Sequence, residues 1–317
     1  MPKITAHTID RIDLPSFVTL VTNDDDIKST PTELSAKTAI VAHNFTRDVF
    51  RSTHTGKSRW TPLTTSARGL FTRGQEVVGR GFPKFFALAE VKTEDEDLSS
   101  FTYPVHAYHK WNGFLAIAFY TPDDGLIITN KSGIENSYNT IHLSNLVVDK
   151  TPGLKEKLTS FLSKHPTLSV TLEIIAPEED DKHIVVYSKD IAVPLSVIDN
   201  ASGDIVTDYD ELFDIKPVNT LSNRRELNDF VQHVKRDETD LTEGYVLRGA
   251  NGYQIKLKTP YYLRAKSVRG RLDKNVPLHN INKLSWPYGG KKWFIEAASN
   301  HIKFTPEWAE KMQLSQQ

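Results

Sequence analysis

The residues most suited to covalent chemistry lie in the stretch Tyr108–Phe114, YHKWNGF, which leads directly into the apolar run LAIAFY. Lys110 stands three residues before Gly113. This arrangement fits an ordinary strand entrance, and it also fits a lysine nucleophile. A lysine amine attacks only when it is unprotonated, whereas its ordinary pKa is about 10.4. A reactive Lys110 therefore needs nearby cations and partial burial, which lower that pKa.

Four further charged residues lie on separate predicted strands. Glu173 interrupts the apolar strand LSVTLEIIA, and Glu243 opens the strand EGYVLR. Lys256 and Lys258 are two residues apart on one strand, so both ammonium groups point to the same face. Neighbouring like charges repel, and burying them is costly unless an anion such as a nucleotide phosphate balances them. Each residue taken singly also fits a solvent-facing carboxylate or a lysine at a strand edge.

The order of these residues resembles the covalent nucleotidyltransferase superfamily of ligases and RNA capping enzymes. The strongest resemblance is to the ATP-dependent RNA ligase of the bacteriophage tRNA-repair type, and to the adenylyltransferase domain of fungal tRNA ligase. Seven elements carry it and cover about residues 68–262: Ala67-Arg68-Gly69, Pro83-Lys84-Phe85-Phe86, Lys110-Trp111-Asn112-Gly113, Asn130-Lys131-Ser132-Gly133, the strand Thr171–Pro177 around Glu173, Glu243-Gly244-Tyr245-Val246, and Lys256-Leu257-Lys258 followed by Tyr262. KxxG alone is a weak signal, whereas seven elements in order are a strong one.

The resemblance implies a specific reaction. Lys110 would attack the α-phosphorus of ATP to form lysyl-AMP, and Lys256 and Lys258 would neutralise the phosphate in the transition state. Glu243 would hold Mg²⁺, with Mn²⁺ as an alternative, and Glu173 would contact the ribose or assist the metal. The remaining residues expected to bind the nucleotide are Arg68, Lys84, Phe86, Gly113, Lys131 and Tyr262.

The AMP would next pass to an RNA 5′-phosphate, and a 3′-hydroxyl would then displace it and seal the strand. The expected partner is thus RNA with 5′-phosphate and 3′-hydroxyl ends, cleaved tRNA being one candidate. A ligase with this requirement often depends on a separate end-healing kinase and phosphatase. We expect a monomer without a membrane partner.

Two departures from the family pattern affect this interpretation. The family's N-terminal tyrosine has no counterpart, since no tyrosine precedes Tyr103; Phe45 could stack but cannot donate a hydrogen bond. Asn112 stands where DNA ligases and capping enzymes typically carry aspartate, which favours the RNA ligases. The alternatives are another covalent nucleotidyltransferase, either a DNA ligase or a capping guanylyltransferase, and a nucleic-acid-binding module without catalysis.

The elements that would position these residues alternate between hairpins and helices. Hairpins are predicted for 113–120 with 126–129, for 168–176 with 183–188, and for 244–248 with 253–258. Helices are predicted over 153–164 and 222–236, the latter with Asn223 and Glu226 as a capping box. The first 90 residues are mixed, with a possible helix at 33–50 and strands around 68–80. The predicted fold class is α+β, a nucleotidyltransferase fold of antiparallel sheets flanked by helices.

The charge distribution predicts a division of the chain. Net charge is −1 over 317 residues, but residues 258–317 hold 11 Lys and Arg against 4 Asp and Glu. We expect an adenylyltransferase domain over 1–262 and a small basic C-terminal module over 263–317. That module is either a solvated cationic tail or, with its interspersed aromatic residues, a site for RNA phosphates and bases.

Composition excludes several classes of protein. The chain has no cysteine, which excludes disulfides, thiol nucleophiles and cysteine-bound zinc and fits a reducing cytosol. No apolar run approaches the ~18 residues of a membrane span, and the N-terminal MPKITAHTIDRIDLP lacks the apolar core of a secretory signal. We therefore expect a cytoplasmic protein, in the host cytoplasm if it is viral.

Overall fold

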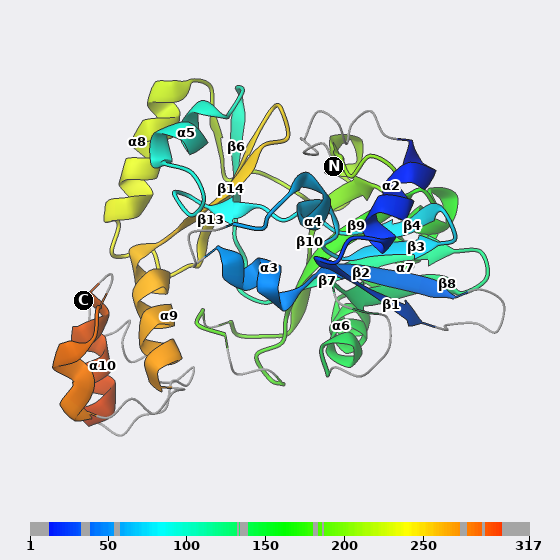
Figure 1. Ribbon diagram of the computed structural model, residues 1–317. Coiled ribbons are helices and arrows are strands. Elements are labelled where there is room, and N and C mark those ends of the chain that lie inside the picture. Colours follow the sequence, from blue (N-terminus) through cyan, green and yellow to red (C-terminus); the bar gives the residue numbers. More distant parts are fainter. Residues whose placement is uncertain are drawn as a thin grey trace. The chain divides into compact units, whose positions relative to one another are not determined.

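The computed structural model describes residues 13–32, 39–53, 58–131, 133, 139–179, 183–185, 187–272, 278–286 and 289–299 (Figure 1). The chain divides into two compact units, each built from three segments. The first unit comprises Met1–Phe85, Phe114–Ile175 and Asp190–Lys216, and the second comprises Phe86–Gly113, Ala176–Lys189 and Pro217–Gln317. The chain therefore passes between the units at five points, after residues 85, 113, 175, 189 and 216.

The described part of the first unit contains two antiparallel sheets. One has the strand order β1-β2-β3-β4 and the other β11-β10-β9-β7-β8. The elements are α2 (Leu14–Thr22), β1 (Ile27–Thr32), β2 (Ile40–Phe45), α3 (Arg47–Ser52), α4 (Pro62–Ser66), β3 (Leu70–Arg73), β4 (Glu76–Arg80), β7 (Phe114–Thr121), β8 (Gly125–Asn130), α6 (Asn139–Lys150), α7 (Leu154–Lys164), β9 (Leu168–Ile175), β10 (Ile191–Asp199), β11 (Ile205–Val206) and the 3₁₀ turn η1 (Thr207–Tyr209).

Alternating side chains of β7 explain how these sheets pack. Ile117 and Phe119 face the β1–β4 sheet and join Phe71 in one buried cluster. Ala116 and Ala118 point to the opposite face, which α6 and α7 cover. On the outer face of the β1–β4 sheet, α2 packs its buried Phe17, Val18 and Val21. The first unit is thus layered as helix, sheet, sheet and helices.

The second unit is built on one mixed sheet with the order β12-β6-β13-β14-β5, in which only β5 runs parallel to its neighbour. Its elements are β5 (Phe86–Ala87), α5 (Glu94–Ser99), β6 (Val105–His109), β12 (Asn219–Leu221), α8 (Arg224–Arg236), β13 (Gly244–Gly249), β14 (Gln254–Lys258), α9 (Pro260–Leu272), the 3₁₀ turn η2 (Leu278–Lys283) and α10 (Gly290–Ser299).

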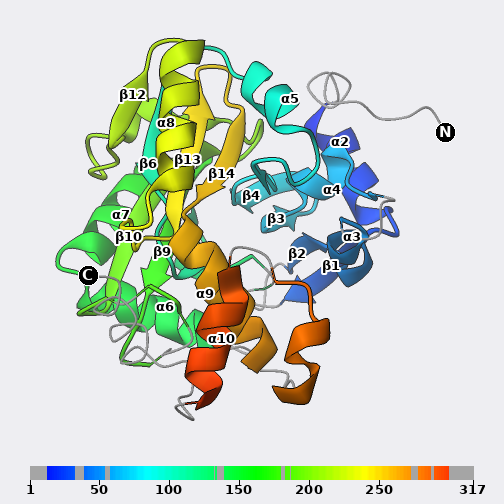
Figure 2. The ribbon, with the colours of Figure 1, turned by 90° about the vertical axis from the view of Figure 1, so that its left-hand side faces the viewer.

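Helix α8 covers one face of this sheet (Figure 2). Its buried Leu227, Val231 and Val234 recur at helical spacing and pack with Val105 and Leu247 of the sheet. The helix begins as predicted, because the Asn223 side chain accepts a hydrogen bond from the Glu226 N–H at 3.0 Å. Helix α10 packs beside α9 (Figures 1 and 2).

The predicted α+β fold class is confirmed, and so are the hairpins β7–β8 and β13–β14, the helices α7 and α8, and the strands near 68–80. Two predictions were wrong. Strand β9 pairs with β10 and β7, and the described residues of 183–188 are not a strand. Residues 40–45 form strand β2 in place of the helix predicted over 33–50, of which 33–38 lie outside the described residues.

The predicted domain boundary at residue 262 falls within α9, which runs through Pro260–Leu272. The separate basic module from residue 263 stays a prediction. In the part of the chain that the structure describes, no helix is long and apolar enough to cross a membrane.

Candidate active site

Lys110 directly follows β6, and its main chain extends the pairing with β13. Its N–H donates a hydrogen bond to the carbonyl of Gly244 at 2.8 Å. The side chain places Nζ 2.9 Å from Oε1 of Glu243, with 19% of the lysine side chain and 5% of the glutamate side chain exposed. The predicted nucleophile and the predicted metal ligand, distant in sequence, are therefore in direct contact.

Lys258 joins this pair from β14. Its Nζ lies 3.7 Å from the same Oε1 of Glu243 and 5.0 Å from the ring centroid of Tyr262. Burial and the charges of Lys266 and Lys110 together lower the pKa of Lys258 to about 8, against the opposing effect of Glu243. One buried carboxylate thus serves two ammonium groups, so the group carries an excess of positive charge.

Asn112 anchors the other oxygen of Glu243. Its Nδ2 donates to Oε2 of Glu243 at 3.0 Å, and its Oδ1 accepts from the N–H groups of Ile184 and Val185 at 2.9 and 3.0 Å. Its own N–H donates to the Tyr187 hydroxyl at 2.9 Å. The N–H groups of Ile184 and Val185 are thus engaged by a side chain and not by a neighbouring strand. We call Lys110, Asn112, Glu243 and Lys258 the nucleophile cluster.

Gly244 allows the nucleophile cluster to form. Its φ of +125° lies outside the range that other residues adopt without strain, and a Cβ atom there would overlap the Leu257 carbonyl oxygen. The glycine thereby lets β13 and β14 approach each other directly after Glu243. The EGYV pattern contains this glycine for a backbone reason.

The other predicted residues of the second unit lie on the same sheet. Lys256 is partly buried on β14, opposite Val246 of β13 and Ala87 of β5, and it shares a face with Lys258 as predicted. Phe86 is partly buried opposite Ile255. Gly113 is the last residue before the chain enters the first unit.

The first unit holds a second group of predicted residues, the cations Arg68, Lys84 and Lys131, which we call the cation cluster. Burial lowers the pKa of Lys131, and the charges of Arg68 and Lys84 lower it further. Burial also lowers the pKa of Arg68, and the negative charge of Glu173 on β9 opposes this lowering. Three cations within mutual electrostatic reach, with the nearby carboxylate acting on Arg68, form a site suited to an anion.

Gly69 brings Arg68 close to Lys131. It has a φ of +67°, and a Cβ atom there would press on the side chain of Ile117 and the backbone of Lys131. The glycine after Arg68 is therefore required by both conformation and close approach.

Aromatic rings that the sequence analysis did not assign lie against the cation cluster. The Lys84 ammonium is 5.6 Å from the ring centroid of Trp60, and the Lys131 ammonium is 5.4 Å from that of Phe45. The two rings meet edge to face with centroids 4.8 Å apart. The sequence indicates only that Phe45 could stack on a base. Trp60 follows a segment without recognisable periodicity, so the sequence offers no signal for it.

Among the residues that the structure describes, no group of three or more His, Cys, Asp or Glu could hold a metal ion. Glu243 nevertheless fits one kind of metal. Magnesium is usually bound through one or two carboxylates plus substrate phosphates, and Glu243 presents a carboxylate beside cations that suit phosphate.

Comparisons with known proteins identify the family and the fold. A family model described as RNA ligase matches residues 66–262, which contain every predicted site residue. No match to a curated protein sequence is found.

Solved structures share the fold at low sequence identity. An archaeal ATP-dependent RNA ligase, form 1, superposes with a TM-score of 0.55 and 12% identity over 86% of this chain and 69% of that chain. Form 2 gives 0.53 and 10% over 99% and 79%. A candidate ATP-dependent DNA ligase of Aquifex aeolicus gives 0.54 and 12% over 95% and 78%. The resemblance at this identity concerns the fold.

Proposed function

Because the chain belongs to the RNA ligase family, we propose that it seals RNA in an ATP-dependent reaction of three steps, with Lys110 as the nucleophile. The observation that carries this proposal is the contact of Lys110 with Glu243, shared with Lys258 and braced by Asn112. Structural relatives described as ATP-dependent RNA ligases support the choice of ATP.

In the first step the Lys110 amine attacks the α-phosphorus of ATP. The bond from that phosphorus to the bridging oxygen breaks, pyrophosphate leaves, and the nitrogen loses a proton as lysyl-AMP forms. Lys256 and Lys258 neutralise the charge that develops on the α-phosphate. Arg68, Lys84 and Lys131 bind phosphates, and Glu173, Phe86, Gly113 and Tyr262 complete the nucleotide contacts.

Glu243 is the residue that would hold a divalent cation, Mg²⁺ or Mn²⁺. Such a cation, when bound, supplies positive charge to the phosphates of the nucleotide. The carboxylate pairs with the Lys110 ammonium in the free protein, at 2.9 Å, and the attacking amine must be free of its proton. Glu243 therefore exchanges partners before the attack, while Asn112 keeps its second oxygen fixed.

In the second step an RNA 5′-phosphate oxygen attacks the phosphorus of lysyl-AMP, and Lys110 leaves and regains a proton. In the third step an RNA 3′-hydroxyl attacks the 5′-phosphate and AMP leaves. The substrate is RNA with these two ends, and cleaved tRNA is a suitable source. A separate kinase and phosphatase would supply the ends in a cytoplasmic repair reaction.

The segment from α9 to α10 is our candidate for RNA contact. Its described side chains include many cations: Arg264, Lys266, Arg269, Arg271, Lys283, Lys291 and Lys292. The Arg271 guanidinium lies 4.2 Å from the ring centroid of Trp286. Cations beside an aromatic ring suit an RNA backbone and its bases.

The test is transfer of label from α-labelled ATP to the protein, followed by a chase with 5′-phosphorylated RNA. We expect wild type to become labelled and to pass the label to RNA, with circular RNA as product. Lys110→Ala should abolish labelling, with a loss of more than roughly 1,000-fold, the scale observed when other enzymes lose their nucleophile. Lys155→Ala, an exposed lysine on α7, should label normally.

Labelling of Lys110→Ala would refute the central role of this lysine. GTP and nicked DNA, offered in parallel, test the capping-enzyme and DNA-ligase alternatives. If the wild type takes up no label, the remaining alternative is a nucleic-acid-binding module without catalysis.

A further inference from the structure

Trp60 is partly buried next to the cation cluster, and its ring contacts both Lys84 and Phe45. Its ring lies 5.6 Å from the Lys84 ammonium and meets the Phe45 ring, which in turn lies 5.4 Å from the Lys131 ammonium. Two of the three cations are therefore placed against one aromatic pair. This is a specific arrangement, because an ammonium is attracted to the face of an aromatic ring.

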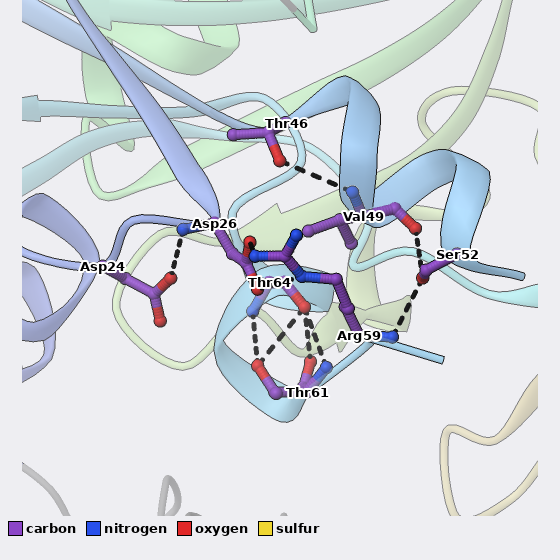
Figure 3. A network of polar contacts seen from close by, with 8 residues as sticks. All are labelled: Asp24, Asp26, Thr46, Val49, Ser52, Arg59, Thr61 and Thr64. Atoms are coloured by element: carbon purple, nitrogen blue, oxygen red, sulfur yellow. Dashed lines mark hydrogen bonds and ion pairs between the residues drawn. The ribbon is translucent and has the colours of Figure 1, made fainter. Parts of the chain in front are cut away.

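The Trp60 ring is held by residues on both sides of it. Its indole N–H donates to the Thr53 hydroxyl at 2.8 Å. The preceding Arg59 forms a two-pronged ion pair with Asp26, and its N–H donates to Ser52 Oγ at 2.9 Å (Figure 3). We call Asp26, Ser52, Thr53 and Arg59 the brace.

The brace is itself anchored to regular structure. Ser52 is the last residue of α3 and donates from its hydroxyl to the Val49 carbonyl at 2.6 Å. On the other side, Thr61 and Thr64 form the capping box that starts α4 (Figure 3). Trp60 is therefore fixed between two helix ends, and its side-chain rotation is restricted.

The same segment also holds the main chain of Lys84. The Lys84 N–H donates to the carbonyl of Thr65 in α4 at 2.8 Å. Lys84 is therefore held at both ends: its backbone by α4, and its ammonium by the Trp60 ring together with the Phe85 carbonyl, to which it donates at 3.2 Å.

A free lysine side chain samples many rotamers, and its ordering costs up to about 2 kcal/mol. Repulsion among Arg68, Lys84 and Lys131 would favour conformations in which the ammonium groups move apart. An aromatic face holds an ammonium group against this repulsion and leaves its charge in place. A carboxylate would also hold the ammonium group, but it would neutralise the charge. The cations therefore stay available to phosphate.

We propose that Trp60 is a positioning residue for ATP binding: fixed by the brace, its ring holds the Lys84 ammonium in the conformation that receives a nucleotide phosphate. This role rests on the proposed function, because it presumes that Lys84 binds ATP. The Trp60 ring has no phenolic hydroxyl, unlike the N-terminal tyrosine that the resemblance leads one to expect.

The test compares Trp60→Leu, Trp60→Phe and the control Phe50→Leu in the formation of lysyl-AMP. Trp60→Leu should raise the KM for ATP about five- to ten-fold, the scale of a lost cation–π contact, with the maximal rate within about two-fold. Trp60→Phe keeps an aromatic face and should stay within about three-fold of wild type. Phe50 stacks on Phe45 from an exposed position, so Phe50→Leu should change neither constant.

A second measurement starts from protein that is already adenylylated and follows the transfer of its AMP to RNA. General structural damage by the substitution would slow this step as well. Since ATP binding is then complete, Trp60→Leu should perform this step at the wild-type rate. Thr53→Val, which removes the acceptor of the indole N–H and keeps the ring, should raise the KM for ATP about two- to three-fold, roughly the value of one hydrogen bond. It decides the matter if Trp60→Leu fails to fold.

An unchanged KM in folded Trp60→Leu, or a Trp60→Phe variant as impaired as Trp60→Leu, would overturn the positioning role. An equal loss in the RNA step would do the same, since it would indicate general damage. If the wild type takes no label from ATP, the proposed function itself fails, and that result differs from a labelled wild type whose KM does not respond to Trp60.

Discussion

At the scale of single residues, Asn112 shows why the identity of one side chain in KWNG matters. An asparagine donates from its amide nitrogen and accepts at its oxygen, and both capacities are used: the donor on Glu243, the acceptor on Ile184 and Val185. An aspartate could accept the same two N–H bonds but would set a second negative charge beside Glu243.

Replacement of Asn112 should therefore affect both stability and catalysis. Asn112→Ala leaves two buried backbone donors without their acceptor, and we expect a loss of about 2–3 kcal/mol in the free energy of unfolding. Labelling by ATP should fall at least ten-fold, roughly the effect of losing one buried hydrogen bond that positions Glu243. Urea unfolding and label transfer measure the two effects. Wild-type rates in Asn112→Ala would mean that Glu243 does not need this support.

His43 links three strands of the first unit through its side chain. It is 1% exposed, its Nδ1 lies 2.8 Å from Ser29 Oγ of β1, and its Nε2 lies 2.9 Å from Thr72 Oγ1 of β3. Burial lowers its pKa to about 4. Between that value and its ordinary pKa of about 6.5, the unfolded chain binds more protons than the folded one, so stability falls as the pH falls.

Acidification should expose this effect. From pH 7 to pH 5 the wild type should lose about 2 kcal/mol more stability than His43→Gln, whose amide does not titrate. Urea unfolding at the two pH values provides the comparison. Parallel losses in the two proteins would show that His43 protonation does not oppose folding.

At the scale of elements, the β13–β14 hairpin delivers both Glu243 and Lys258. Its register places Gly244 opposite Lys258, and the close approach depends on the missing side chain at Gly244. Gly252, in the turn of the same hairpin, also has a positive φ, +75°, but an added Cβ would meet no atom within 4 Å. A substitution at Gly252 therefore tests backbone strain alone, whereas one at Gly244 tests strain together with steric overlap.

Alanine substitution should affect these two positions unequally. Gly252→Ala should cost about 1 kcal/mol, the strain of a left-handed alanine. Gly244→Ala adds an overlap with backbone and should cost at least ~3 kcal/mol, comparable to overpacking a core, and it should displace Glu243 and abolish labelling. Similar thermal midpoints and activities for the two variants would contradict this account.

The elements also show what could be predicted from the sequence. Hairpins with short turns were predicted correctly, because β7–β8 and β13–β14 are specified locally by alternation and turn residues. The partner of β9 was not, since Asn112, far away in sequence, engages the donors of Ile184 and Val185. Strand β2 was taken for a helix because both of its faces contribute buried residues, which hides a two-residue period.

At the scale of the whole molecule, the order of charged motifs predicted the RNA ligase family, which the family match confirms. The contact of Lys110 with Glu243 follows from that order together with strand pairing. The contacts of Asn112 with Glu243, of Trp60 with Lys84 and of Arg59 with Asp26 could not be predicted, because they join segments far apart in the sequence.

The basic C-terminal segment should act on RNA and not on ATP. The double reversal Lys291→Glu with Lys292→Glu changes two exposed lysines of α10. It should weaken binding of RNA about ten-fold or more at low salt and reduce the salt slope by about 2, while labelling by ATP stays unchanged. Lys155→Glu with Lys164→Glu on α7 carries the same change in net charge and should bind RNA nearly as wild type does. Equal weakening by both pairs would indicate net charge alone.

The interleaving of the two units also sets a schedule for biosynthesis. Asn112 and Glu243 are 131 residues apart along the chain, so at typical rates of synthesis Asn112 exists for roughly 7 to 26 s before the carboxylate that it binds is made. Until residues 219–221 are made, β6 lacks both of its neighbours in the sheet, β12 and β13, and its apolar Val105 and Ala107 have no cover from α8. The nascent chain therefore presents an unpaired strand to the cell's chaperones, and the nucleophile cluster is complete only when the translating ribosome has passed Lys258.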